Sequence, residues 1–397
     1  MTGTPRRWGV AGLGRAFTLM LPTFVADPRV RLCAAADPRA EARARFTADF
    51  DAPAYATVDE LCADPAVDVV YVASPHQMHA SHAIAAARHG KHVLVEKPMS
   101  LSLTDCTRMI DAASAAGVQL VVGHSHAFDA PIARARALID THAFGPVRMI
   151  HAFYYTDFMY RPRRPEELDT AQGGGAVWNQ AAHQVDIVRL LAGGRATSVR
   201  ALTGNWDAKR NTEGAYSALL TFEGGSFASL TYNGYGYFDS DEFCDWIGEL
   251  GMRKSAGNHG VARSALGAAP DAAAEVALKN ARNYGGSAYR AAAITDPATQ
   301  AHQHFGTFII SCEGGDLRPM PHGVMVYDAA GARLEPLPPP TVPRVEVIDA
   351  LERAIASGVP ALHDGRWARA TLEVCAALLE SARTGVEVAL HQQVSVR

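Results

Sequence analysis

The chain has 397 residues, which is too long for one ordinary hydrophobic core and favours two domains. Hydrophobic residues make up 48% of the chain and charged residues 20%, as is typical of a globular protein. Lys and Arg number 37 against 41 Asp and Glu, so the net charge is -4, and no long basic stripe is present. This balance argues against a nucleic-acid partner. The densest basic cluster, which consists of Arg161, Arg163 and Arg164, is short and suits a discrete anionic small molecule better than a polymer.

We expect neither disulfide bonds nor a membrane segment. Six scattered cysteines without a C-x-x-C pair are typical of buried thiols in a reducing compartment: Cys33, Cys62, Cys106, Cys244, Cys312 and Cys375. Near the N-terminus, Arg6 and Arg7 precede an apolar stretch that glycines interrupt at once, so it is neither a signal peptide nor a membrane span. The expected location is the cytoplasm, with no membrane partner.

Short apolar runs alternate with helical patterns along residues 1–125. We predict strands over residues 8–11, 30–36, 67–73, 92–96 and 118–123, and helices over residues 40–49, 79–89 and 104–116. Several of these strands are apolar without alternation, as strands covered on both faces should be. Strand and helix repeated in this way imply an α/β domain with a doubly wound parallel sheet.

The pattern changes after residue 125, and residues 126–397 are expected to form an α+β domain with a mainly antiparallel open sheet. We predict strands over residues 147–155, 198–206, 215–222 and 226–232, and helices over residues 176–191, 345–357 and 365–384. Glu223-Gly224-Gly225 predicts a hairpin between the last two strands. Residues 252–300 are rich in alanine and show no clean partner pattern, so we interpret them as an insertion.

A glycine turn follows the first strand and opens a helix. In Gly12-Leu13-Gly14 the first glycine permits a tight turn, and the second lets the backbone approach a pyrophosphate held at the helix N-terminus, beside Arg15 and Ala16. This is the context of a dinucleotide-binding fingerprint. The third glycine of that fingerprint is absent, because Phe17 stands in its place. A merely structural turn is therefore the alternative.

Asp37 supports the dinucleotide interpretation, because it ends the second strand about twenty residues after the glycines. A carboxylate there binds the ribose hydroxyls of the cofactor and repels a 2′-phosphate, which favours NAD over NADP. Arg39 leaves NADP open, since a nearby guanidinium can hold that phosphate. A helix N-cap is the alternative role for Asp37.

Three further motifs carry a family resemblance. Ser74-Pro75 with His79 follows the third strand and Glu96-Lys97-Pro98 ends the fourth, at the carboxyl ends where ligands bind to parallel sheets. Together with Gly173-Gly174-Gly175 and His183-Gln184-Val185-Asp186, they resemble the Gfo/Idh/MocA oxidoreductases over nearly the whole chain apart from residues 252–300. The resemblance implies a Rossmann domain, a substrate-binding domain, and assembly as a homodimer or homotetramer.

The resemblance also implies roles for single residues. The lysine that matches Lys97 lies beside the nicotinamide and the reacting carbinol, where it stabilises alkoxide character, and the Lys-Pro bond is often cis in relatives. A surface lysine is the alternative. We include among the cofactor-binding residues Gly12, Gly14, Arg15, Ala16, Asp37, Ser74, Pro75, His79, Glu96 and Lys97. A metal site made by His76, His79 and His82 is not expected, because their spacing drifts around a helix.

His183 matches a family histidine on the helix that lines the substrate pocket, and its near-neutral pKa suits a general base that acts with Lys97. A core histidine is the alternative. Four residues earlier this chain has Asn179, where relatives have aspartate. An amide can orient the substrate or the imidazole but cannot stabilise an imidazolium by charge. Asp186 either takes over that duty or is a structural partner.

The substrate is expected to be an anionic ring. Arginines bind carboxylates bidentately and aromatic side chains cover flat rings, which makes candidates of Tyr155, Arg161, Arg163 and Arg164, with Asn179 and His183. A solvated basic loop is the alternative for the arginines. Short stretches at 179–186 and 234–239 resemble the branch that includes phthalate 4,5-cis-dihydrodiol dehydrogenases. That branch implies oxidation of a cis-dihydrodiol carboxylate to a catechol in aromatic catabolism. A sugar or inositol dehydrogenase and a non-catalytic nucleotide-binding regulator stay open.

Overall fold

A computed structural model describes residues 4–257, 259–267, 269–290 and 300–396. Contacts divide the chain into two compact units, and the first combines residues within 1–124, 273–295 and 342–369. The second unit holds residues within 125–272, 296–341 and 370–397. The sequence analysis assigned everything after residue 125 to the second domain, whereas the described parts of 273–295 and 342–369 pack with the first unit. Of the expected insertion, residues 258, 268 and 291–299 lie outside the described part of the chain.

The first unit is built on a six-stranded parallel sheet in the order β3-β2-β1-β4-β5-β6. The strands are β1 (Arg6–Ala11), β2 (Val30–Ala36), β3 (Ala54–Tyr55), β4 (Val69–Val72), β5 (His92–Val95) and β6 (Leu120–Val122). Every residue of β4 is buried, as expected for a strand covered on both faces. The predicted doubly wound sheet is confirmed, and the two-residue β3 was not predicted.

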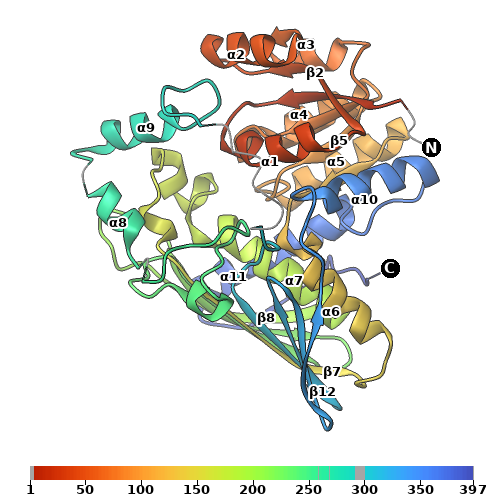
Figure 1. Ribbon diagram of the computed structural model, residues 1–397, viewed down its shortest axis with the longest axis vertical. Helices are drawn as coiled ribbons and strands as arrows, with labels where there is room; N and C mark the ends of the chain where they lie inside the picture. Colours follow the sequence, from red (N-terminus) through yellow and green to blue (C-terminus); the bar gives the residue numbers. More distant parts are fainter. Residues whose placement is uncertain (1–3, 258, 268, 291–299, 397) are drawn as a thin grey trace. The chain divides into compact units, whose positions relative to one another are not determined.

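The first unit contains helices from both sides of the expected insertion in the chain, and one of them has a capping signal at each end. They are α1 (Arg15–Ala26), α2 (Ala40–Phe50), α3 (Val58–Ala63), α4 (His79–Arg88), α5 (Leu103–Ala116) and α10 (Val345–Ser357), shown in red to orange, with α10 in blue, in Figure 1. The hydroxyl of Ser102 caps α5 by accepting from the backbone N–H of Asp105. The helix ends at Gly117, whose φ of 67° lies in the left-handed region.

A segment from the expected insertion packs on the first unit. After α9 (Ala272–Ala281), Tyr284 is fully buried and its ring lies edge-on to Phe17, with the centroids 5.1 Å apart. Its hydroxyl donates to a carboxylate oxygen of Asp49 at 2.7 Å. Gly285 lies so close to α2 that a Cβ there would be 2.9 Å from the Cα of Ala42. Phe17, which replaces the third fingerprint glycine, is therefore a docking point for this segment.

The second unit is built on a nine-stranded sheet in the order β14-β13-β12-β11-β7-β10-β9-β8-β15. The strands are β7 (Val147–Tyr155), β8 (Ala196–Gly204), β9 (Ala215–Phe222), β10 (Phe227–Asn233), β11 (Thr307–Cys312), β12 (Gly315–Met320), β13 (Gly323–Asp328), β14 (Gly331–Pro336) and β15 (Val388–Ala389). Only the central pair β7 and β10 is parallel, so the mainly antiparallel sheet is confirmed. The hairpin between β9 and β10 was predicted; β11 to β14 were not.

Helices cover one face of this sheet. They include α6 (Ala130–Asp140) and α7 (Ala182–Ala192), and the unit also holds the short α8 (Val261–Leu266) and most of α11 (Gly365–Thr384). Figure 1 shows α6 and α7 beside the strands, and α6 contacts β12 and β13 while α7 contacts β7 and β10. The opposite face carries exposed apolar side chains: Met149, Leu202, Leu219, Phe227 and Ile309. Assembly through that face stays a prediction. No helix among the described residues is long and apolar enough to cross a membrane.

Candidate active site

The glycine turn after β1 has the geometry that a dinucleotide requires. Gly12 has a φ of +102°, and a Cβ there would lie 2.8 Å from the carbonyl oxygen of Ala73, so glycine is needed for both reasons. Around Gly14, in contrast, no atom lies within 4 Å of the Cβ position. Gly14 precedes α1 without a side-chain cap, and the first-turn N–H groups, including those of Arg15 and Ala16, have no intrahelical acceptor. This open helix N-terminus fits a pyrophosphate.

Asp37 directly follows β2 and is almost completely buried. One carboxylate oxygen, Oδ2, accepts from the backbone N–H of Leu13 at 2.8 Å, which ties the strand end to the glycine turn. The other, Oδ1, accepts from the backbone N–H and the Nε of Arg39 at 2.9 and 3.0 Å. The helix α2 begins with Arg39 as its N-cap, so Asp37 is not the cap that the alternative interpretation proposed.

The loops after β4 and β5 are joined by His79, whose side chain is fully buried. One ring nitrogen lies 2.9 Å from the carbonyl oxygen of Ser74, and the other lies 2.9 Å from that of Pro98. Burial lowers the pKa of His79 to about 4. Because its two ring nitrogens contact one backbone oxygen in each loop, His79 holds the two loops together. Of its neighbours, Ser74 contacts His82 through its hydroxyl, and Pro75 precedes the 3₁₀ turn His76–Met78.

Glu96 and Lys97 follow β5 at the carboxyl edge of the parallel sheet. Glu96 is buried and accepts a hydrogen bond of 2.6 Å from the hydroxyl of Tyr71. Burial raises the pKa of Glu96 above its usual range. Glu96 therefore fastens the loop that follows β5 to Tyr71 of β4. Lys97 is half-buried, and its peptide bond to Pro98 is cis.

In the second unit, His183 lies in the first turn of α7 and is 5% exposed. A π-helical turn (Val177–Ala181) precedes α7 and shifts the register that an uninterrupted helix would have. The amide of Asn179 donates to the carbonyl oxygens of Gly173 and Gly175 at 3.1 and 2.8 Å. These bonds hold the triple-glycine loop, which is a structural role that the sequence analysis did not foresee.

His183 packs against His126 in the 3₁₀ turn His126–Phe128, with ring centroids 4.7 Å apart. The backbone N–H of His126 donates to Nδ1 of His183 at 3.4 Å. On its other side, His183 meets the ring of Phe305 at 4.6 Å. Asp186 is bonded to the hydroxyls of Ser125 and Thr371, which makes it an anchor between segments.

His126 lies between two carboxylates and is 1% exposed. Its Nδ1 is 2.7 Å from Oδ2 of Asp129, and its Nε2 is 3.6 Å from Oε1 of Glu249. Burial alone lowers the pKa of His126, but the two carboxylates outweigh it and raise that pKa above the usual value. The ring of His126, held between these two carboxylates, lies edge-on to the ring of His183.

The predicted arginines differ in their surroundings. Arg161 reaches Glu249 at 3.4 Å, which connects it to the histidine pair. Arg163 lies over the ring of Phe158, 3.8 Å from its centroid. Arg164 pairs with Glu166 at 2.9 Å and Glu167 at 3.6 Å. Arg161 is thus the arginine that shares a charge network with the surroundings of His183.

Tyr155 does not join this network, because neighbouring residues of a strand point to opposite faces. Its ring lies 6.1 Å from that of Phe238, whereas Tyr154 on the helix-covered face meets Phe305 at 5.1 Å. Tyr154 therefore shares the helix-covered face with Phe305, and substrate binding by Tyr155 stays a prediction.

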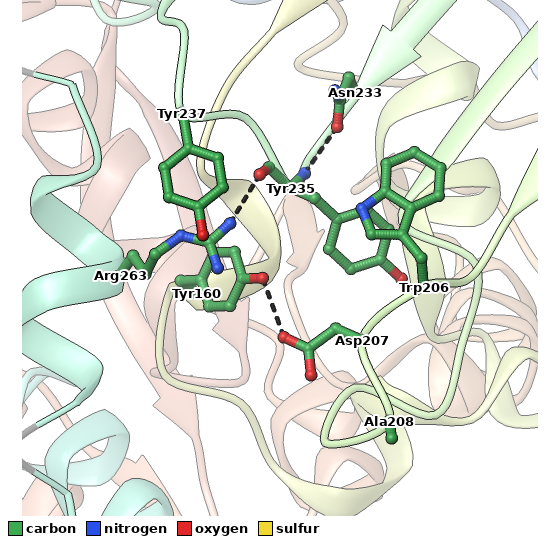
Figure 2. A pocket seen from close by; sticks show the side chains of 8 residues that line it. All are labelled: Tyr160, Trp206, Asp207, Ala208, Asn233, Tyr235, Tyr237 and Arg263. Carbon is green, nitrogen blue, oxygen red and sulfur yellow. Dashed lines mark hydrogen bonds between the residues drawn. The ribbon is translucent and has the colours of Figure 1, made fainter.

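A separate pocket of about 360 Å³ opens at the ends of β7, β8 and β10. Figure 2 shows the side chains that line it. The guanidinium of Arg263 lies between the rings of Tyr160 and Tyr237, and its central carbon is 3.6 and 4.1 Å from their centroids. Arg263 also donates to the carbonyl oxygen of Tyr235 at 2.7 Å, and Tyr160 donates to Asp207. The stack fastens α8, which comes from the expected insertion, to the sheet. His183 does not line this pocket.

Comparison with known proteins identifies the family of the chain. Residues 6–124 match the NAD-binding Rossmann-fold domain of the Gfo/Idh/MocA oxidoreductases, and residues 132–253 match a C-terminal domain of that family. The chain belongs to the Gfo/Idh/MocA family. It is an NAD-binding oxidoreductase, so the resemblance, the enzyme class and the cofactor inferred from the motifs are confirmed.

Individual relatives span most or part of the chain. The chain is 48% identical over 378 residues to 1-carboxy-3-chloro-3,4-dihydroxycyclohexa-1,5-diene dehydrogenase of Comamonas testosteroni, and the match covers 95% of each protein. The crystal structure of a proposed dehydrogenase from Bordetella bronchiseptica RB50 is similar with a TM-score of 0.91 and 43% identity, covering 97% of this chain and 100% of that one. Inositol 2-dehydrogenase 3 of Saccharopolyspora erythraea is 30% identical over 191 residues, 47% of this chain and 53% of that protein.

Sequence reasoning missed three titratable residues of the network around His183. His126 and Asp129 follow β6, and the carboxyl end of a parallel strand was a usable signal that was applied only to the loops after β4 and β5. Glu249 lies more than a hundred residues further along, beyond the reach of any local pattern. Its contribution follows from the tertiary fold alone.

Substitutions of Gly12 and Gly14 by alanine should have different effects on stability and on NADH binding. Gly14→Ala should leave the thermal unfolding midpoint unchanged, because its Cβ meets no protein atom, yet weaken NADH binding about tenfold or more by intruding where the backbone meets pyrophosphate. Gly12→Ala should lower the midpoint as well, because its Cβ meets the Ala73 carbonyl. Thermal unfolding and fluorescence titration with NADH measure both effects. Unchanged NADH affinity in Gly14→Ala would contradict the assigned pyrophosphate site.

Asp129→Asn tests the charge on His126. Removing a carboxylate that raises the pKa of His126 should lower that pKa, which a pH titration of the ring protons by NMR records. A histidine with a raised folded-state pKa stabilises the protein below its unfolded-state pKa and loses this contribution as the pH rises through the folded-state value. The variant should therefore lose stability chiefly on the acidic side of that window. Asp140→Asn, at an exposed position, is the control. An equal shift of the His126 pKa in the Asp129→Asn and Asp140→Asn variants would refute the pairing of His126 with Asp129.

Proposed function

We propose that the chain is an NAD-dependent dehydrogenase that oxidises a cyclic cis-dihydrodiol carboxylate to the corresponding catechol carboxylate. The observation that carries this proposal is the connection of Arg161 through Glu249 to the His126–His183 pair. This network connects Arg161, the candidate carboxylate-binding group, with the candidate acid–base histidine within one unit. The Comamonas testosteroni relative supports the substrate class, since its name specifies a dihydroxycyclohexadiene that carries a carboxyl group.

The reaction is balanced as an alcohol oxidation. One hydroxyl of the diol loses its proton, and the hydrogen on the same carbon leaves with its electron pair to NAD, which supplies the oxidant when bound. The resulting hydroxy-dienone tautomerises to a catechol. Aromatisation drives the sequence forward, so the protein has only to hold the ring, orient the hydroxyl and manage one proton.

The surroundings of His183 favour a role as hydrogen-bond donor. Because the backbone N–H of His126 donates to Nδ1, a neutral His183 carries its proton on Nε2. The ring can then donate through Nε2 to the substrate oxygen and stabilise developing negative charge. The sequence analysis assigned the proton-accepting role to His183. We assign that role to the neutral amine of Lys97, which follows β5 at the carboxyl edge where such sheets bind their ligands.

Arg161 is proposed to bind the substrate carboxylate. Its side chain is 45% exposed and its bond to Glu249 uses one of five guanidinium N–H donors. Glu249 in turn holds the guanidinium in place, as it does the imidazole of His126. Arg164, which is already paired with two glutamates, is assigned no such role.

A polyol dehydrogenase is the second candidate, because inositol 2-dehydrogenase 3 is among the relatives. The two candidates differ in what they require of the substrate. A polyol is uncharged and gives Arg161 no anion to bind. The formation of NADH from a cis-dihydrodiol carboxylate, beside myo-inositol and glucose, separates them. Turnover of the polyols alone would replace the first proposal by the second.

Arg161→Ala is the sharper test. The KM for the carboxylated diol should rise about tenfold or more, because a hydrogen-bonded charge pair is lost, while the KM for the matching diol without a carboxyl group stays the same. Arg164→Ala, in the same loop, is the control and should change neither KM. Steady-state rates of NADH formation give all of these values. An equal rise for both substrates in Arg161→Ala would remove the carboxylate-binding role.

A further inference from the structure

The carboxylate of Asp37 has no acceptor capacity left over for a ribose. Its Oδ2 accepts from the Leu13 backbone at 2.8 Å and from a terminal nitrogen of Arg39 at 3.2 Å. Its Oδ1 accepts from the backbone N–H and the Nε of Arg39 at 2.9 and 3.0 Å. Four hydrogen bonds fill the four lone-pair positions of a carboxylate. A ribose hydroxyl can bind Asp37 only if the guanidinium gives way.

Arg39 is held from both sides while it covers Asp37. One terminal nitrogen donates to the carbonyl oxygen of Leu13 at 2.8 Å, and the other donates to that of Tyr284 at 3.4 Å. Leu13 belongs to the glycine turn, and Tyr284 belongs to the docked segment of the expected insertion. The guanidinium is therefore confined at the adenosine end of the dinucleotide site.

The charges around Asp37 do not add up to a repulsion of the 2′-phosphate of NADP. Asp37 and Arg39 cancel formally, because they form an ion pair with a 3.0 Å separation. Arg43 adds a positive charge, and its guanidinium donates to the backbone carbonyls of Asp37 and Pro38 at 2.8 and 2.9 Å. The simple rule that an aspartate at the end of the second strand excludes NADP assumes an unpaired carboxylate. That assumption fails here.

We propose that Arg39 makes this site accept the 2′-phosphate of NADP as well as the 2′-hydroxyl of NAD. With NADP, the guanidinium turns from Asp37 to the phosphate and forms charge-assisted hydrogen bonds. With NAD, it moves aside and Asp37 accepts the ribose hydroxyls. The choice between the two cofactors is thus a competition between a carboxylate and a phosphate for one guanidinium. The inference concerns the first unit alone and does not depend on the proposed substrate.

Direct binding measures this competition without turnover. Fluorescence titration of the purified full-length chain with NADH and NADPH should give dissociation constants within about tenfold of each other, because the carboxylate is neutralised. Arg39→Ala should weaken NADPH binding about ten- to one-hundredfold, the range for loss of hydrogen bonds to a charged group. In the same variant NADH binding should stay equal or become tighter, since Asp37 is released. High salt should weaken NADPH binding more than NADH binding in the parent chain.

Arg45→Ala is the matched control, because it removes the same charge from α2, the helix that Arg39 precedes, and from a residue that pairs with Asp49. It should leave the ratio of the two dissociation constants unchanged. A parent chain that binds NADH but not NADPH overturns the proposal. So does an Arg39→Ala variant that loses no NADPH affinity, or one that loses no more than Arg45→Ala. Circular dichroism confirms that the variants are folded.

Discussion

The burial of His126 between two carboxylates is the interaction on which the second unit's site depends. Asp129 and Glu249 lie on the two sides of an imidazole that is 1% exposed, so the carboxylates and the buried ring are partners of one another. Removing one member would leave an uncompensated buried charge, which costs far more than the loss of a surface ion pair. The arrangement therefore fixes the positions of all its members at once.

Several features of the site follow from that constraint. The backbone of His126 directs its N–H to Nδ1 of His183, which sets the tautomer of the histidine that faces the substrate in our proposal. Glu249 reaches from His126 to Arg161, so the same carboxylate orients the guanidinium. In the first unit the glycine turn plays the comparable part, because Gly12 permits the contact with Ala73 and Asp37 bonds the backbone of Leu13.

The local sequence pattern predicted most strands and helices of the first unit. Buried parallel strands appear in a sequence as short apolar runs, and glycines at the turns separate them from the helices between them. The pattern failed for β11 to β14, where strands such as Gly315–Met320 and Gly331–Pro336 contain proline and polar residues and are defined by their neighbours in the sheet. The sequence could not decide between Tyr154 and Tyr155, because the face of a strand cannot be assigned without knowing which side the helices cover. Phe17 gave no sign that Tyr284 would dock on it, since that contact joins residues far apart in the chain.

The proposed reaction requires His183 to act in the oxidation, and one comparison tests this role most directly. NADH formation from a cis-dihydrodiol carboxylate is measured for His183→Ala and for His151→Ala, whose exposed imidazole bonds Ser229 on the far face of the sheet. We expect His183→Ala to lose about a hundredfold or more in kcat while it still binds NADH, and His151→Ala to retain full activity. A His183→Ala variant that keeps the turnover of the parent chain would contradict the account.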